Sequence, residues 1–208
     1  MGTPYPQLLL LAYTILAAAL QAPSPESPEE RARWNRMFEV QPARIRWEPN
    51  AFLMQVANEL KPGDALDIGM GSGRNALYLA RAGWNVTGFD TSTVGVVKAR
   101  AAATEAKLAL NAIEADMFAF DYGTARYDLI VVMYMGRIEP LGARIVTALR
   151  PGGHLVIEHY GGGYEPDSLP RVFPGLEILR YSEDEGFPDY NQRTKGPVLR
   201  FHARKALN

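Results

Sequence analysis

The sequence predicts an α/β fold: a mostly parallel sheet with helices on both faces that ends in an antiparallel hairpin. Two observations predict it. Between residues 64 and 160, short apolar runs of strand character alternate with helix-like segments. The runs LEILRYSEDEG and GPVLRFHARK then follow each other without a helix-length segment between them, which favours an antiparallel pair. The 208 residues suffice for one such domain with a sizeable core.

Five strands and three connecting helices are expected in the alternating part. The expected strands are 64–69, 85–90, 109–116, 127–135 and 154–160. The expected helices between them are 74–83, 91–107 and 140–153. Gly83 would end the first helix, Thr91 or Ser92 would cap the second, and a Pro-Gly-Gly run would end the third. The unbroken apolar run YDLIVVMYM indicates a strand buried on both faces.

Helical patterns precede the first strand. EERARWNRMFEV places Trp34 and Phe38 on one helix face, where they could cover a site or simply pack. NAFLMQVANEL continues the pattern, with Asn50 as a plausible N-cap. We therefore expect the domain to consist of a helical lid, residues 31–60, and a Rossmann-like sheet core, residues 61–208.

The first 30 residues are expected to form an apolar leader and a linker. Leu8 to Leu20 is apolar or nearly so, but it is shorter than the roughly 20 residues of a membrane span. It has the length of a signal-peptide core, although no Lys or Arg precedes it. A cleaved or membrane-associated leader and a terminal helix packed on the domain both remain open, and so does localisation. The Pro/Ser/Glu stretch from Gln21 to Glu30 predicts a linker.

Composition excludes some classes of function. The chain has 22 basic and 23 acidic residues and a net charge of −1, so it lacks the basic field that a nucleic-acid partner would need. It has no Cys, which excludes disulfides, thiolate nucleophiles and Cys-ligated metals.

The glycine-rich stretch LDIGMGSGRN follows the first expected strand. Gly69, Gly71 and Gly73 leave a bare backbone at the carboxyl end of that strand, where open parallel sheets bind ligands. The NAD fingerprint has glycine where Arg74 stands, and Asp67 would repel a phosphate. The loop therefore favours a positively charged ligand without phosphates, such as S-adenosylmethionine (SAM), over NAD(P).

Two further acids close the next two strands. Asp90 could accept both ribose hydroxyl protons, a role that NAD and SAM proteins share. Asp116 could meet the adenine amino group while Met117 packs on the ring. Each of these acids could instead be only a strand-end cap. Thr91 and Met133 complete the set of residues that we expect to bind the cofactor.

These motifs resemble those of a known family. ALDIGMGSGRNALYLARAGWNVTGFD resembles motifs I and II of class I SAM-dependent methyltransferases, and it is most similar to the tellurite-resistance and thiopurine type. RYDLIVVMYM, LRPGGHLVIE and the ending SEDEGFPDYN…GPVLRFHARK extend the resemblance over roughly residues 31–208. It implies a Rossmann-like sheet of seven strands with an antiparallel last strand, and a small-molecule methyl acceptor. The apolar leader departs from the family.

The acceptor side is predicted from the ends of the fourth and fifth strands. Tyr134 and His159 should border the transferred methyl group, and His159 could act as a base or be a hydrogen-bonded strand-end residue. The segment Leu129–Gly136 contains no acid or Lys at the strand end, so a soft nucleophile such as a thiol, chalcogen or halide anion is expected. Arg137 could bind an acidic substrate or be solvated.

No metal is expected, since the fourth strand ends without carboxylates and His154 and His159 would lie on opposite faces of a strand. The predicted reaction is therefore transfer of the SAM methyl group to a small molecule, with S-adenosyl-L-homocysteine (SAH) as the product. A SAM- or SAH-binding module without catalysis and an NAD(P)-dependent oxidoreductase are the alternatives.

Overall fold

The computed structural model describes residues 27–40, 48–136, 138–161, 164, 168–191 and 193–207. The predicted leader, most of the predicted linker and Arg137 lie outside these ranges. No helix within them is both long enough and apolar enough to cross a membrane.

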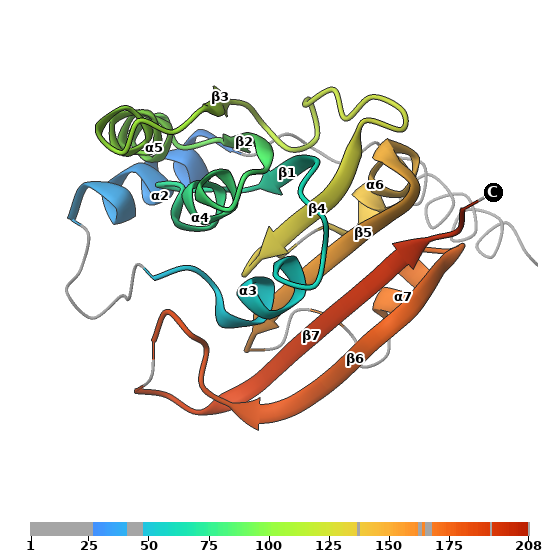
Figure 1. Ribbon diagram of the computed structural model, residues 1–208. Coiled ribbons are helices and arrows are strands. Elements are labelled where there is room, and N and C mark those ends of the chain that lie inside the picture. Colours follow the sequence, from blue (N-terminus) through green and yellow to red (C-terminus); the bar gives the residue numbers. More distant parts are fainter. Residues whose placement is uncertain are drawn as a thin grey trace, which may run out of the picture.

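Seven strands form one sheet in the order β3-β2-β1-β4-β5-β7-β6 (Figure 1). The strands are β1 (Asp64–Ile68), β2 (Asn85–Asp90), β3 (Leu110–Glu114), β4 (Tyr127–Met133), β5 (Leu149–Tyr160), β6 (Leu176–Gly186) and β7 (Gly196–Lys205). The first five are parallel, and β7 is antiparallel to both β5 and β6. The predicted seven-stranded, mostly parallel sheet with an antiparallel C-terminal strand is confirmed.

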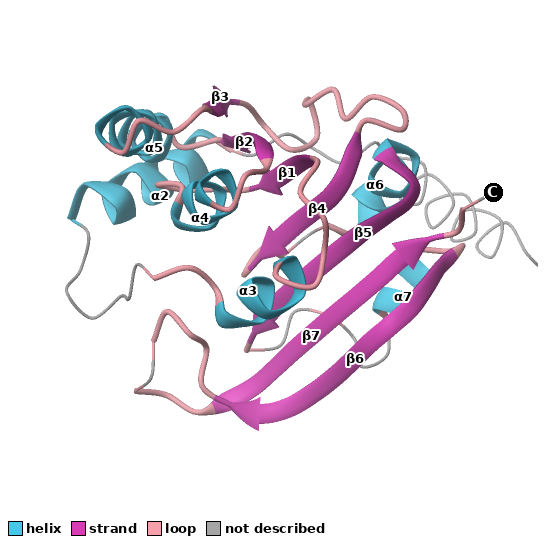
Figure 2. Cartoon of the chain, in the orientation of Figure 1, coloured by secondary structure: helices cyan, strands magenta, loops and turns pink. Residues whose placement is uncertain are grey.

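Helices cover both faces of this sheet (Figure 2). They are α2 (Pro28–Val40), α3 (Ala51–Ala57), α4 (Arg74–Arg81), α5 (Thr93–Glu105), α6 (Gly142–Ala148) and α7 (Leu169–Val172), and a short 3₁₀ helix, η1 (Glu139–Leu141), precedes α6. Ser92 caps α5, since its hydroxyl accepts a hydrogen bond from the Gly95 amide. Asn50 caps α3, as the sequence predicted, since its side-chain oxygen accepts a hydrogen bond from the Leu53 amide.

The core consists of two apolar layers, one on each face of the sheet. Residues of β4 alternate between them because successive strand side chains point to opposite faces. Leu129 and Val131 pack with α3 and α4, whereas Ile130 and Val132 pack with η1, α6 and α7. Both sets are fully buried, which agrees with the unbroken apolar run of this strand.

The start of β5 differs from the prediction. Residues 149–153 were expected to end a helix, but β5 already begins at Leu149, which pairs with Tyr127 across a register shift. Gly152 has a left-handed backbone (φ 77°), and a Cβ on Gly153 would lie 2.9 Å from the Tyr127 carbonyl oxygen. The Pro-Gly-Gly run therefore forms an irregular strand start instead of a helix end.

The end of the predicted linker also needs correction. Residues 28–30 belong to α2, because Ser27 and Glu30 form a capping box. The Glu30 amide donates to the Ser27 hydroxyl, and the Ser27 amide donates to a Glu30 carboxylate oxygen, each at 3.2 Å. Pro28 stands at the first helical position, where a missing amide proton costs nothing.

Candidate active site

A cavity of about 490 Å³ lies at the carboxyl ends of β1, β2 and β4, beneath α2. Its size is typical of small-molecule sites. Since β1 lies between β2 and β4, the order of the strands reverses here, which is where such sheets bind ligands. The wall residues are Glu30, Arg33, Trp34, Met37, Phe38, Gly69, Met70, Gly71, Ser72, Arg74, Asn75, Phe89, Asp90, Thr91, Ala115, Met117, Met133, Tyr134, Met135, Gly136 and Tyr190.

The loop after β1 borders this cavity and requires glycine. Gly69 and Gly71 both have left-handed backbone, with φ of 67° and 57°. A Cβ on Gly71 would lie 2.5 Å from Cζ of Phe38, and one on Gly69 would lie 1.9 Å from Sδ of Met135. A side chain at either position would strain the backbone and collide with the cavity wall. Gly73, also left-handed, precedes α4 and is not a wall residue.

Asp90 connects the end of β2 to the glycine loop. Its carboxylate accepts the Gly71 amide at 2.9 Å and the Ser92 amide at 2.7 Å, one on each oxygen. Burial raises the pKa of Asp90, and these two amides oppose the rise. Each oxygen retains acceptor capacity, and Asp90 lines the cavity. The residue thus caps its strand end and can also accept hydrogen bonds from a ligand.

Asp67 is buried near the same loop and is only 1% exposed. Its Oδ2 has no hydrogen-bond partner among the described residues. Burial raises the pKa of Asp67 to about 7, although the charge of Arg74 and the Ala76 amide act in the opposite direction. Asp67 is not part of the cavity wall. Its unsatisfied oxygen favours a nearby cation or hydrogen-bond donor.

Arg74 lines the cavity, but its guanidinium joins three segments of the chain. It donates to the Glu48 carbonyl oxygen at 2.7 Å and to Oδ1 of Asp189 at 3.2 Å. It also lies 5.7 Å from the centre of the Tyr134 ring. The residue predicted to bind the cofactor therefore ties the glycine loop to the N-terminal and C-terminal parts of the domain.

The residues after β2 and β3 differ in their access to the cavity. Thr91 and Met117 both line it, and the Thr91 hydroxyl is buried without a hydrogen-bond partner in the described part of the chain. Asp116 is not a wall residue, and its Oδ1 accepts the Phe118 amide at 2.7 Å. The observed bond is that of a turn cap, so contact of Asp116 with an adenine stays a prediction.

At the end of β4, Tyr134 lines the cavity with a left-handed backbone (φ 59°), which is uncommon for a residue other than glycine. Its hydroxyl lies against two carboxylate oxygens, Glu158 Oε1 and Asp189 Oδ1 (2.7 Å), and can donate its one proton to either of them. Burial raises its pKa, and the charges of Glu158 and Asp189 raise it further. The phenol is therefore held in its protonated form at neutral pH.

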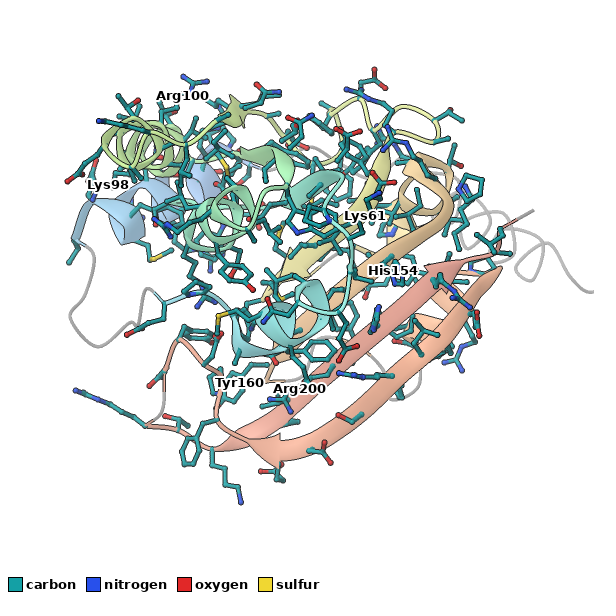
Figure 3. The ribbon with its side chains drawn as sticks, in the orientation of Figure 1. Lys61, Lys98, Arg100, His154, Tyr160 and Arg200 are labelled. Carbon is teal, nitrogen blue, oxygen red and sulfur yellow. The ribbon has the colours of Figure 1, made fainter. Side chains whose placement is uncertain are left out.

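Glu158 is a residue that the sequence interpretation missed. It is only 2% exposed and lies within the otherwise apolar part of β5. Oε1 accepts from the Asn50 side chain at 2.8 Å and from Tyr134, and Oε2 accepts from Arg200 Nε at 2.7 Å. Figure 3 shows Arg200 and Tyr160 at the end of the β5–β7 pair that lies away from His154. A charged residue in a buried strand was the available signal.

Methionine is the commonest residue of the cavity wall. Five of the seven methionines of the chain line the cavity: Met37, Met70, Met117, Met133 and Met135. Trp34 and Phe38 of α2 also line it, as the sequence suggested. The resulting surface is polarizable and largely apolar.

The predicted acceptor-side histidine is not on this wall. His159 lies next to Glu158 in β5, so it faces the opposite side of the sheet, and its ring packs edge-on against Tyr164 at 4.9 Å. His154, in turn, shares a 2.9 Å hydrogen bond with His202 of β7. Within the described ranges, no three His, Asp or Glu side chains gather as a metal site would require.

Asp189 and Tyr190 were also missed. Both lie between β6 and β7, far along the chain from Tyr134, and Tyr190 lines the cavity. They fall in the stretch FPDYN, which supported the family resemblance but suggested no role for either residue. Their contacts with Tyr134 depend on how the segment between β6 and β7 lies against the end of β4, which the sequence pattern does not reveal.

The chain is similar to known methyltransferases. A family model described as "Methyltransferase domain" matches residues 65–153. A ubiquinone biosynthesis O-methyltransferase of Alkalilimnicola ehrlichii is 28% identical over 176 residues, which cover 82% of this chain and 68% of that protein. Hemagglutinin 1 of Eikenella corrodens is 26% identical over 152 residues, covering 64% of this chain; the match spans only half of that relative's length.

A solved structure shares the fold. The 1,6-didemethyltoxoflavin-N1-methyltransferase of Burkholderia thailandensis, determined with its substrate and SAH, has a TM-score of 0.63 and 18% identity. The likeness covers 90% of this chain and 93% of that one. The matched domain, the methyltransferase relatives and the strand order described above all support the resemblance to class I SAM-dependent methyltransferases.

Proposed function

We propose that the chain binds SAM in this cavity and transfers its methyl group to a small, soft nucleophile, such as a thiol, a heavier chalcogen or a halide anion. Bound SAM would supply a methyl group already activated by a sulfonium. The protein then needs chiefly to bind, orient and exclude water, which can be worth on the order of 7–11 kcal/mol of the barrier.

The residues at the β1 and β2 ends fit this cofactor. Asp90 offers two carboxylate oxygens with spare lone pairs, and Thr91 offers a buried hydroxyl without a partner in the described ranges. Asp67 lies buried behind the glycine loop, outside the cavity wall, where its carboxyl group would favour a cationic group nearby through its charge and not by contact. Gly69 and Gly71 leave backbone where any Cβ would collide. These are complementary to ribose hydroxyls and an ammonium group, and not to a pyrophosphate.

The residues at the end of β4 support a soft methyl acceptor. Of the described titratable groups there, only Tyr134 lines the cavity; its hydroxyl lies against the carboxylates of Glu158 and Asp189, which with burial raise its pKa, so it does not supply a base for an alcohol. Met133 and Met135 flank it in the cavity wall. A soft anion needs no base, and removing it from water raises its reactivity. The wall therefore suits a polarizable acceptor.

Titration calorimetry and an acceptor panel test this proposal. SAM and SAH should bind, whereas NADH should not, and small thiols, selenide or iodide should be methylated. NADH binding in place of SAM would indicate an oxidoreductase. SAM binding without any turnover would indicate a binding module. Methylation of hydroxyl acceptors alone, the chemistry in the name of the Alkalilimnicola relative, would contradict the soft-acceptor assignment.

A further inference from the structure

The segment between β6 and β7 completes the cavity beside Tyr134. Tyr190 is its wall residue, and the Tyr190 ring meets the Tyr134 ring edge-on, with centroids 4.6 Å apart and planes at 81°. On its other side the Tyr190 ring lies 6.4 Å from that of Tyr160 at the end of β5. Tyr190 thus lies at the β4–β5 side of the cavity, away from Asp90 on β2.

Asp189 attaches this segment to the rest of the site. Its Oδ1 lies 2.7 Å from the Tyr134 hydroxyl and 3.2 Å from Arg74 Nη2, and its amide donates to the same hydroxyl at 3.1 Å. The side chains of Arg74 and Asp189 are only 14% and 19% exposed. An ion pair shielded in this way holds its geometry better than an exposed one. Since Tyr190 is the next residue, these bonds fix the backbone from which its ring projects.

The position of Tyr190 limits what can bind next to Tyr134. A ligand that contacts Asp90 and the glycine loop occupies the β1–β2 side, which leaves for the second substrate the space beside Tyr134, Tyr190 and the two methionines at the end of β4. A ring that borders that space determines how large an acceptor can be. Two substrates that differ by one methylene group in such a pocket differ in kcat/KM by about 10–200-fold.

We propose that Tyr190 selects the methyl acceptor by size. Asp189 positions Tyr190 through its hydrogen bonds to Tyr134 and Arg74. This inference rests on the proposed function, because it assigns an acceptor side to the same cavity. It makes Tyr190 a specificity-determining residue and Asp189 a positioning residue. The segment between β6 and β7 then forms one wall of the acceptor site, and the bond between Asp189 and Arg74 fixes its position.

The first test compares acceptors of increasing size. Methanethiol, propanethiol and thiophenol serve as the series, and kcat/KM is measured for each. Tyr190→Ala should raise the ratio of kcat/KM for the largest acceptor to kcat/KM for the smallest by about tenfold or more. Asp189→Ala should raise KM for every acceptor more than it lowers kcat, and Asp189→Asn, which keeps an oxygen facing Tyr134, should restore part of the loss. An unchanged size ratio in folded Tyr190→Ala would overturn the role of Tyr190.

The second test does not depend on turnover. Amide hydrogen exchange of residues 187–191 is followed in the SAH complex. Asp189→Ala should speed exchange there by about tenfold or more, whereas Asp184→Ala, an exposed position on β6, should not. Equal protection in both variants would overturn the role of Asp189.

The two proposals can fail separately. If the wild type methylates alcohols or amines but no thiol, the soft-acceptor class is wrong, and a size series of those acceptors decides the role of Tyr190. If SAH binds but nothing is methylated, the proposed function is wrong, the acceptor role of Tyr190 falls with it, and hydrogen exchange still decides whether Asp189 holds the segment.

Discussion

The two ends of the cavity are built in different ways. The end at β1 and β2 is made of neighbours in sequence: Asp90 accepts the amides of Gly71 and Ser92, 19 and 2 residues away. The end at β4 and β5 is made of residues from distant parts of the chain, since Tyr134 meets Asp189 55 residues away and Glu158 meets Asn50 108 residues away. The first end is mainly backbone and carboxylate; the second is mainly side chains.

This difference indicates which part of the cavity can vary. A backbone loop with left-handed glycines tolerates few substitutions, because both conformation and space are restricted. Side chains contributed by separate elements can change one at a time while the sheet persists. We therefore expect variants at the β1–β2 end to affect the cofactor and variants at the β4–β5 end to affect the acceptor.

The largest effect is expected for Gly71→Ala. The left-handed backbone disfavours a Cβ by about 1–2 kcal/mol, and the new methyl would also meet Phe38, so the loop should leave the conformation that binds SAM and SAM affinity should fall by roughly thirtyfold. Calorimetry measures it. Gly186→Ala is the control, because its Cβ would lie 3.4 Å from the nearest atom. Equal affinities for the two variants would contradict the glycine-loop assignment.

Asp90→Ala tests the carboxylate of the same end. Each hydrogen bond from a ribose hydroxyl to a charged group is worth about 1.5–3 kcal/mol, so SAM affinity should fall at least tenfold without loss of the fold. Circular dichroism and calorimetry on the same sample separate the two effects. Unchanged SAM affinity in the folded variant would show that Asp90 caps its strand and does no more.

A pH dependence should follow from Asp67. Its pKa is raised from 3.8 to about 7, so its contribution to the stability of the free protein is fully present below pH 3.8 and is lost as pH rises through about 7. A cationic ligand favours the ionised form, so affinity for SAM should increase from pH 6 to pH 8, by about tenfold at most. Asp67→Asn should flatten this profile. The same slope in that variant would assign the titration to another group.

The smallest effect is expected at the acceptor end, for His159→Ala. Loss of a general base typically costs about 10²–10⁴-fold, but His159 faces away from the cavity wall, so we expect a loss well below tenfold. kcat with a thiol acceptor measures it. Abolished activity would identify His159 as a true base and would contradict the soft-acceptor proposal.

Much of the fold could be predicted from local pattern. The bounds of β2, β6 and β7 and the cap at Asn50 follow from alternation, turn residues and capping chemistry. The start of β5 could not, because a Pro-Gly-Gly run also ends helices, and only pairing with Tyr127 makes it a strand.

Most residues of the candidate site that could be predicted lie at the β1–β2 end of the cavity, and those that could not lie at the β4–β5 end. The glycine loop and Asp90 were visible as a motif that precedes a helix and an acid that ends a strand. Glu158, Asp189 and Tyr190 were not, because their importance comes from contacts across the sheet and the hairpin. His159 was predicted from its place near the end of β5, but side chains alternate along a strand, so its neighbour Glu158 faces Tyr134 instead.

The methionine-rich wall has a practical consequence for spectroscopy. Five methionines line the cavity, while Met54 lies outside it and Met1 lies outside the described residues. Methionine methyl groups are flexible and can be labelled selectively with carbon-13. Together they would report on four parts of the wall: Met37 on α2, Met70 on the glycine loop, Met117 after β3, and Met133 and Met135 at the end of β4. Chemical-shift changes on titration would then show directly which side of the cavity each ligand occupies.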